Sequence, residues 1–183
     1  MSKWDSNAPK EIKTTTNWSE ELLEKAQSEE DIERTDVIPG KDVFLLRPCF
    51  NQQECDNIIT AAELLGFGRT DYPKKYRGNL RLITEDDSLS LELWRRVCPH
   101  VPSQVTEDGH VWDAVGLNEC FRLSKYSDGD VFGSHVDTCY IRNSIEKSMY
   151  TVNIYLNSAG PGKQLLFMSH LMKELTVYPT CEM

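Results

Sequence analysis

Residues 117–143 read LNECFRLSKYSDGDVFGSHVDTCYIRN, and residues 146–157 read EKSMYTVNIYLN. Phe121 and Leu123 alternate with polar residues in the first stretch, and Tyr150, Val152 and Ile154 do so in the second. Alternation with a period of two is typical of a half-buried β-strand. The two stretches therefore predict two strands that are connected through a glycine-containing turn and a polar loop.

His135 and Asp137 stand two positions apart between these strands. On a strand, side chains at i and i+2 point to the same face, so we expect an imidazole and a carboxylate side by side. With one more histidine, these groups form the facial triad that holds non-haem iron(II) and leaves coordination positions open. An HxD pattern alone arises by chance in roughly one chain in three, so the flanking residues decide. A zinc hydrolase using the same pair is a weaker alternative, because neither an HExxH motif nor a third ligand supports it.

The flanking residues resemble the prolyl 4-hydroxylase-like family of iron(II)- and 2-oxoglutarate-dependent oxygenases. The family shows a basic residue followed by tyrosine, a glycine turn, a phenylalanine shortly before HxD, and a later T-x-x-x-Y-L-N strand. The matching residues are Lys125, Tyr126, Gly129, Phe132, His135, Asp137, Thr151, Tyr155, Leu156 and Asn157. The resemblance is strong over residues 117–157 and looser over 42–102.

The resemblance implies an α+β fold, a double-stranded β-helix (jelly-roll) with supporting N-terminal helices and incomplete C-terminal strands. It implies Fe(2+), 2-oxoglutarate and ascorbate as cofactors, with dioxygen as the second small-molecule partner. The reaction would hydroxylate a protein side chain or a small molecule while 2-oxoglutarate is decarboxylated to succinate. The residues implied are the metal ligands His135 and Asp137, the 2-oxoglutarate-pocket residues Tyr126 and Tyr155, and the substrate contacts Asn79 and Arg81.

The tail departs from the family after Asn157. Family members continue with a distal histidine, the third iron ligand, and about ten residues later an arginine or lysine. Here the only later histidine is His170, and Lys173 is the only basic residue after it. The tail is apolar and helix-like, which suggests a shifted reading frame or an alternative exon after about Lys163. We therefore expect a chain that binds iron weakly and has little activity; a non-catalytic interaction module with the same scaffold is the alternative.

The chain divides by pattern into a polar, partly disordered leader (1–38), the oxygenase domain (39–157) and the aberrant tail (158–183). A short helix capped by Asn17 or Ser19 is expected in the leader. A strand over 42–50 precedes a helix that begins after Asn51 and ends at Gly66. Its apolar stripe is Cys55, Ile58, Ile59, Ala62 and Leu65. A second helix over 87–98 should bury Leu93, Trp94 and either Val97 or Leu91.

Composition excludes several classes of protein. The net charge is −9 and the sequence pI about 4.9, so an acidic surface should repel phosphate backbones and no nucleic-acid partner is expected. No apolar run approaches the roughly 20 residues of a membrane-spanning helix, and no secretory signal is evident. The six cysteines form no CxxC pair, which argues against a zinc knuckle. We expect a cytoplasmic protein, with the nucleus as the alternative.

Overall fold

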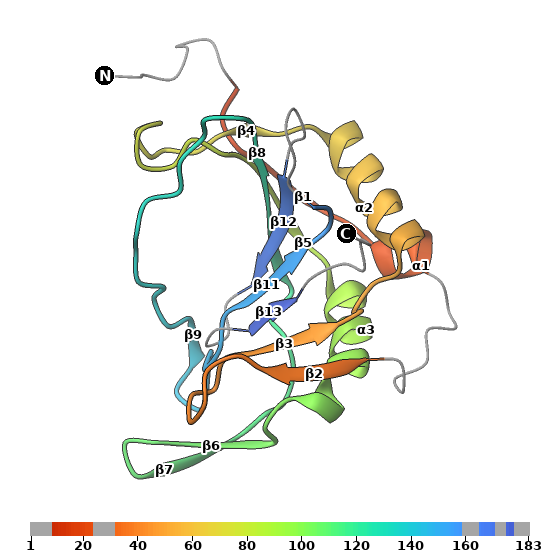
Figure 1. Cartoon of the computed structure of the whole chain (residues 1–183). Helices are drawn as coiled ribbons and strands as arrows, with labels where there is room; N and C mark the ends of the chain where they lie inside the picture. The colour runs from red at the N-terminus through yellow and green to blue at the C-terminus, as the bar shows by residue number, and fades with distance from the viewer. Residues whose placement is uncertain (1–8, 24–31, 159–164, 171–174, 178–183) are drawn as a thin grey trace.

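The computed structural model describes residues 9–23, 32–158, 165–170 and 175–177, the last two segments by their backbone. It is a mixed α/β fold built on one nine-stranded sheet (Figure 1). The strands run in the order β1-β5-β8-β12-β11-β13-β3-β2, with β4 paired to β5. Within the described residues this sheet does not close into a barrel, because its end strands β1 and β2 do not pair with each other.

The sheet strands are β1 (Ile12–Thr15), β2 (Glu33–Asp36), β3 (Phe44–Arg47), β4 (Gly68–Arg69), β5 (Leu80–Glu85), β8 (Cys120–Tyr126), β11 (Val152–Tyr155), β12 (Leu165–His170) and β13 (Leu175–Val177). Two separate hairpins consist of β6 (Gln104–Glu107) with β7 (His110–Asp113), and β9 (Ile141–Asn143) with β10 (Glu146–Lys147). The helices are α1 (Trp18–Leu22), α2 (Gln52–Leu65), α3 (Asp87–Val97) and the 3-10 turn η2 (Cys98–His100). None of the helices in these ranges is long and apolar enough to cross a bilayer.

The two faces of the sheet have different roles. Leu82 of β5 lies opposite Leu123 of β8, and both are fully buried in the hydrophobic core. Lys125, two residues along the same face of β8, donates to Glu63 of α2, so this face meets the helices. Figure 1 shows the helices gathered on that side and the loop between β8 and β9 on the other side. The face away from the helices is therefore the one left for polar groups.

Helix α2 begins and ends where the sequence predicts. The Asn51 side chain accepts from Glu54 N, and Glu54 accepts from Asn51 N, which together form a capping box. Gly66 ends the helix at φ 89°. Three members of the predicted stripe, Cys55, Ile58 and Ala62, are fully buried, but Leu65 is 40% exposed. The stripe prediction thus fails only at the last turn of the helix.

Helix α3 resolves an alternative that the sequence left open. Leu93 and Val97 are buried, whereas Leu91 is 69% exposed. Arg96 on the same helix is also fully buried, and its guanidinium donates to both oxygens of Glu54 on α2 at 2.9 and 2.8 Å. This buried ion pair ties the two helices together.

Part of the segment predicted as a polar leader belongs to the folded domain, because residues 12–22 contribute a strand and a helix to it. β1 pairs in parallel with β5 along its whole length. Trp18, the first residue of α1, is 2% exposed, and its backbone N donates to Asp86. The polar sequence of β1 hides this role, because an edge strand needs only backbone pairing to join a sheet. Asn17 is the N-cap residue of α1, although its side chain makes no capping hydrogen bond.

The prediction of a helix-like tail is wrong for residues 165–170. They form β12, which lies antiparallel between β8 and β11, so that Leu123 and Ile154 flank Met168 in register. A short apolar run fits a buried strand as well as a helix, and the unpaired edges of two neighbouring strands favour the strand here. Residues 159–164, 171–174 and 178–183, with Lys163 and Lys173, lie outside the described residues, so the proposed change of reading frame stays a prediction.

Candidate functional site

The HxD motif lies in the loop between β8 and β9, not on a strand as predicted. This loop is anchored at its start, where Gly133 N donates to the Tyr76 carbonyl at 2.8 Å and Phe132 forms an isolated bridge with Arg77. Residues 133–140 then follow with no strand pairing. The side chains of His135 and Asp137 nevertheless lie together, with Nε2 3.2 Å from Oδ1. The predicted juxtaposition is therefore present, although a strand does not produce it.

Neighbouring groups orient both side chains. The Gly133 carbonyl lies 3.1 Å from His135 Nδ1. Since a carbonyl can only accept, Nδ1–H is the donor in this contact, and Nε2 is the nitrogen that faces the carboxylate. Thr151 Oγ1 donates to the other carboxylate oxygen, Asp137 Oδ2, at 3.1 Å. The Phe132 ring meets the imidazole edge-on, with 4.4 Å between the ring centroids.

The spacing of this pair suits adjacent ligands of one metal ion. Two donors bound at about 2.1 Å and at right angles around a first-row divalent ion stand about 3.0 Å apart. The observed Nε2–Oδ1 distance of 3.2 Å is close to that value. An imidazole nitrogen and a carboxylate oxygen that face each other at this distance can share a cation, either a proton or a metal ion. His135 and Asp137 thus fit two positions of a metal site.

A third metal ligand is not found among the described side chains. No group of three or more His, Cys, Asp or Glu residues within them is arranged to hold a metal ion. The backbone of His170 lies at the end of β12, opposite Val152, which follows the Thr151 that donates to Asp137. The side chain of His170 lies outside the described part of the chain.

Tyr126 and Tyr155 stand at the ends of their strands near this loop. Tyr126 contacts Phe132 edge-on at 6.1 Å between ring centroids, which connects it through Phe132 to His135. Burial raises the pKa of Tyr126, the guanidinium groups of Arg81 and Arg77 oppose this shift, and Asp130 and Tyr155 add to it. Tyr155 lies opposite Phe167 and Phe167 opposite Ser124, so by register Tyr155 is on the same side of the sheet as Ser124 and Tyr126.

Asn79 directly precedes β5, and Arg81 is its second residue. Because they are two positions apart, their side chains point to the same face of the sheet. Asn79 is fully buried and donates through Nδ2 to Ser124 Oγ of β8 at 3.1 Å. Arg81 NH1 lies 3.6 Å from a Glu11 oxygen. Burial lowers the pKa of Arg81, the carboxylate of Glu11 opposes this shift, and Arg77 and Arg122 lower the pKa further.

Three residues have contacts or positions around the predicted site that the sequence alone did not specify. Thr151 was matched as part of a motif, but its hydrogen bond to Asp137 follows only from the fold. Arg77 stacks on Phe132, with 5.0 Å between the guanidinium carbon and the ring centroid. Arg122 lies on β8 and alternates with the buried residues Phe121 and Leu123. That alternation predicts that it lies on the face of the sheet away from the helices, called the open face below.

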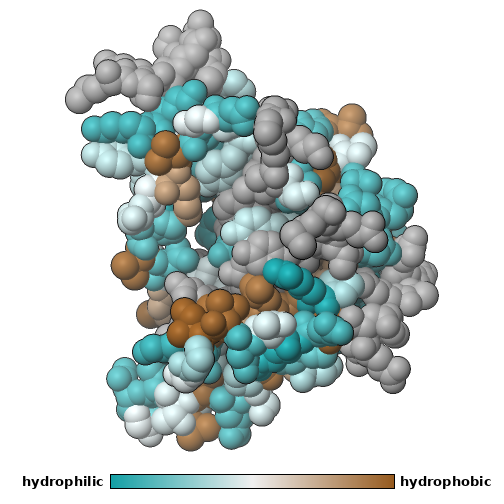
Figure 2. Space-filling view, in the orientation of Figure 1, coloured by the Kyte–Doolittle hydropathy of each residue, from teal (hydrophilic) through white to brown (hydrophobic). Residues whose placement is uncertain are grey.

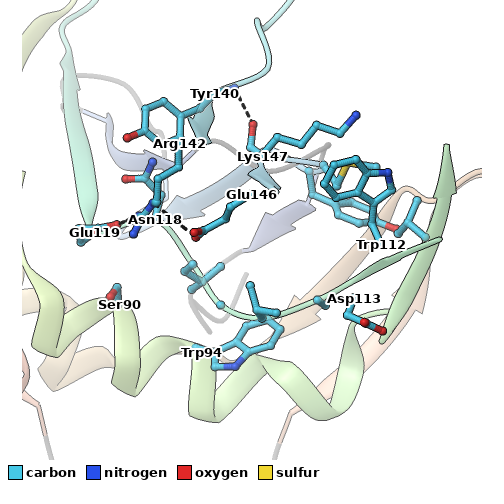
Figure 3. A pocket seen from close by; sticks show the side chains of 18 of the residues that line it. Ser90, Trp94, Trp112, Asp113, Asn118, Glu119, Tyr140, Arg142, Glu146 and Lys147 are labelled. Carbon is cyan, nitrogen blue, oxygen red and sulfur yellow. Dashed lines mark hydrogen bonds and ion pairs between the residues drawn. The ribbon is translucent and has the colours of Figure 1, made fainter. Parts of the chain in front are cut away.

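A separate cavity of about 420 Å³ lies between α3, the segment 112–119 and the β9–β10 hairpin (Figure 3). One side carries Trp94, and the opposite side carries Arg142 in ion pairs with Glu119 and Glu146. Lys147 approaches the Trp112 ring at 4.5 Å from its centroid. The cavity lining does not include any of the six residues predicted as site residues. Arg142 and Lys147 already form ion pairs with carboxylates. The cavity therefore gives no specific reason to expect a charged ligand.

Comparisons with known proteins add no assignment: no protein-family model, curated protein or solved structure matches the chain significantly.

Proposed function

We propose that this chain has the scaffold of an iron(II)- and 2-oxoglutarate-dependent oxygenase of the jelly-roll class, with His135 and Asp137 as two metal ligands. The observation that carries the proposal is the pairing of His135 Nε2 with Asp137 Oδ1 at 3.2 Å. The orientation of both groups, by the Gly133 carbonyl and the Thr151 hydroxyl, supports it. Outer hydrogen bonds of this kind fix the tautomer and the ring orientation of metal-binding histidines.

The residues around the motif have roles that follow from their positions. Thr151 holds one carboxylate oxygen of Asp137, which leaves the other toward the imidazole. Phe132 packs edge-on against His135 and limits the orientations of the imidazole ring. Tyr126 and Tyr155 offer phenolic hydroxyls to a carboxylate-bearing cosubstrate such as 2-oxoglutarate. The bound iron would supply the oxidation chemistry and the protein the positioning and the pocket.

Weak metal binding is part of the proposal. Two protein ligands hold a divalent ion less tightly than three, and the described side chains supply two. The substrate would be a protein side chain or a small molecule, and ascorbate would keep the iron reduced, as the family resemblance implies. The same scaffold without metal binding would be an interaction module.

Turnover of 2-oxoglutarate tests the proposal. Purified chain would be incubated anaerobically with Fe(II), ascorbate and 2-oxoglutarate, and succinate would be measured after oxygen is admitted. We expect slow succinate release that His135→Ala abolishes. His110→Ala is the matched control, since His110 is an exposed histidine on β7. The absence of iron binding in the folded chain would refute the metal site and favour the interaction module, and iron binding without succinate release would refute turnover by this chain.

A further inference from the structure

The face of the sheet that lies away from the helices carries two arginines, Arg81 and Arg122. Arg81 of β5 lies in register with Ser124 of β8, and Ile83 with Arg122. Since paired residues on neighbouring strands share a face and side chains alternate, Arg81, Ser124 and Arg122 point to the same side. Lys125, one position after Ser124, reaches α2 on the opposite face. The arginines therefore face away from the helices.

Arg81 is held in an unusual state for a guanidinium. Its side chain is 13% exposed, and Nε is buried with no hydrogen-bond partner among the described residues. Its one carboxylate neighbour within 4 Å in that part of the chain is Glu11, at 3.6 Å, beyond good hydrogen-bond length. A buried donor without a partner destabilises the folded chain. An acceptor that reached this nitrogen would offset that destabilisation.

A second donor lies next to it. Ser124 is 4% exposed, and its Oγ accepts from Asn79 Nδ2, so its own proton is directed elsewhere. Arg77 and Arg122 both depress the pKa of Arg81, as expected when positive charges gather. Glu11 and Asp130 are carboxylates near these guanidinium groups, and Glu85 of β5 shares the face of Arg122. What the group offers is therefore an unused hydrogen-bond donor, Arg81 Nε, rather than an excess of charge.

Access to this face comes from the side of the HxD loop. Figure 1 shows the β8–β9 loop arching away from the sheet, and Figure 2 shows the surface hollowed beside it. Arg77 stacks on Phe132, and Phe132 packs edge-on against His135, so Arg77 borders the HxD motif through one aromatic ring.

We propose that Arg81 and Arg122, together with the hydroxyl of Ser124, bind a carboxylate group of a small acidic ligand on the open face of the sheet. The identity of that ligand, as the cosubstrate or the substrate of the oxygenase, rests on the proposed function. Arginine provides charge-assisted hydrogen bonds that match a carboxylate, and the unused Nε of Arg81 supplies one of them. The chemistry shared by both sources is the carboxylate.

The test follows the Arg81 Nε–H signal by NMR while succinate is added to the full chain. We expect a saturable shift of this signal as succinate is added. The affinity for succinate should be at least about tenfold weaker in Arg122→Gln and in Arg81→Lys. In Arg81→Lys the binding is followed through other signals, because the Nε–H group is absent. Arg95→Gln is the matched control, because Arg95 is an exposed arginine on α3 bound to Glu92. The absence of a saturable shift in the folded chain, or an equal loss in Arg95→Gln, would overturn the proposal.

Two further measurements show whether the carboxylate belongs to the cosubstrate or to the substrate. They also separate failure of the carboxylate site from failure of the metal site. His135→Ala should bind succinate as the unmodified chain does, because the arginines do not depend on the metal; loss of binding in that variant would contradict the assignment. If the carboxylate belongs to the cosubstrate, Mn²⁺ tightens 2-oxoglutarate binding in the unmodified chain but not in His135→Ala. If it belongs to the substrate, 2-oxoglutarate and succinate bind alike with and without Mn²⁺. Both results support a carboxylate site.

Discussion

Replacing Glu54 with glutamine removes one charge from the buried ion pair that connects α2 to α3. Glu54 and Arg96 have side chains 0% and 1% exposed, and two hydrogen bonds of 2.9 and 2.8 Å join them. Arg96 also donates to the Cys49 carbonyl at 3.0 Å, so the same guanidinium fixes the turn between β3 and α2. Glutamine keeps the shape and the acceptor for Asn51 N, but it takes one charge away from a buried cation whose other carboxylate partner in the described residues, Glu92, is 23% exposed.

The expected loss is large for a single substitution. Removing one partner of a buried ion pair costs about 3–5 kcal/mol, because the remaining charge stays out of water. For a chain of this length, each kcal/mol lowers Tm by about 2–4 °C, so Glu54→Gln should lower Tm by roughly 6–20 °C.

Urea unfolding followed by far-UV circular dichroism measures this loss. The matched control is Glu63→Gln on the same helix, where Glu63 is 41% exposed and pairs with Lys125. An exposed pair contributes about 0.2–1 kcal/mol. A loss for Glu54→Gln no greater than that for Glu63→Gln would refute the reasoning that burial decides the cost.

Three further predictions concern pH, the N-terminal strand and the metal site. Burial raises the pKa of Cys49 to about 12, so its contribution to stability is complete below the unfolded thiol's pKa of about 8.5 and falls as pH rises from there toward 12. Urea unfolding from pH 7 to 10 should show this decline, and an unchanged decline in Cys49→Ala would contradict it. A Cβ at Gly68 would stand 1.8 Å from the Lys10 carbonyl oxygen, so Gly68→Ala should displace the segment 9–11 and speed tryptic cleavage after Lys10, whereas Gly116→Ala, with no atom within 4 Å, should not. Thr151→Val removes the hydrogen bond to Asp137 and should weaken Mn²⁺ binding about 10- to 100-fold by equilibrium dialysis, while Thr106→Val on β6 should leave it unchanged.

Local sequence signals predicted the elements that local chemistry determines. The Asn51–Glu54 capping box and Gly66 define α2, and both follow from short-range preferences. The period-two pattern correctly placed Phe121 and Leu123 in the core. Signals of this kind need no knowledge of what a segment packs against.

Elements whose conformation depends on partners were predicted less well. β1 is polar and joins the sheet only because β5 offers a free edge. Residues 165–170 form a strand because β8 and β11 pair with them on both sides. The amino-acid sequence of this segment alone does not show that pairing. His135 and Asp137 meet in a loop, so their contact depends on groups that hold them, Gly133 and Thr151, rather than on strand alternation. The arginine group on the open face likewise depends on strand register.

Titration with Mn²⁺, followed by NMR of the histidine imidazole signals, tests the pairing of His135 with Asp137 most directly. His100 and His110 serve as internal references within the same sample. The proposed site predicts that the His135 signal broadens at the lowest Mn²⁺ concentration and that Asp137→Ala removes this preference. Equal broadening of the His110 signal, or unchanged broadening of His135 in Asp137→Ala, would contradict a shared metal site.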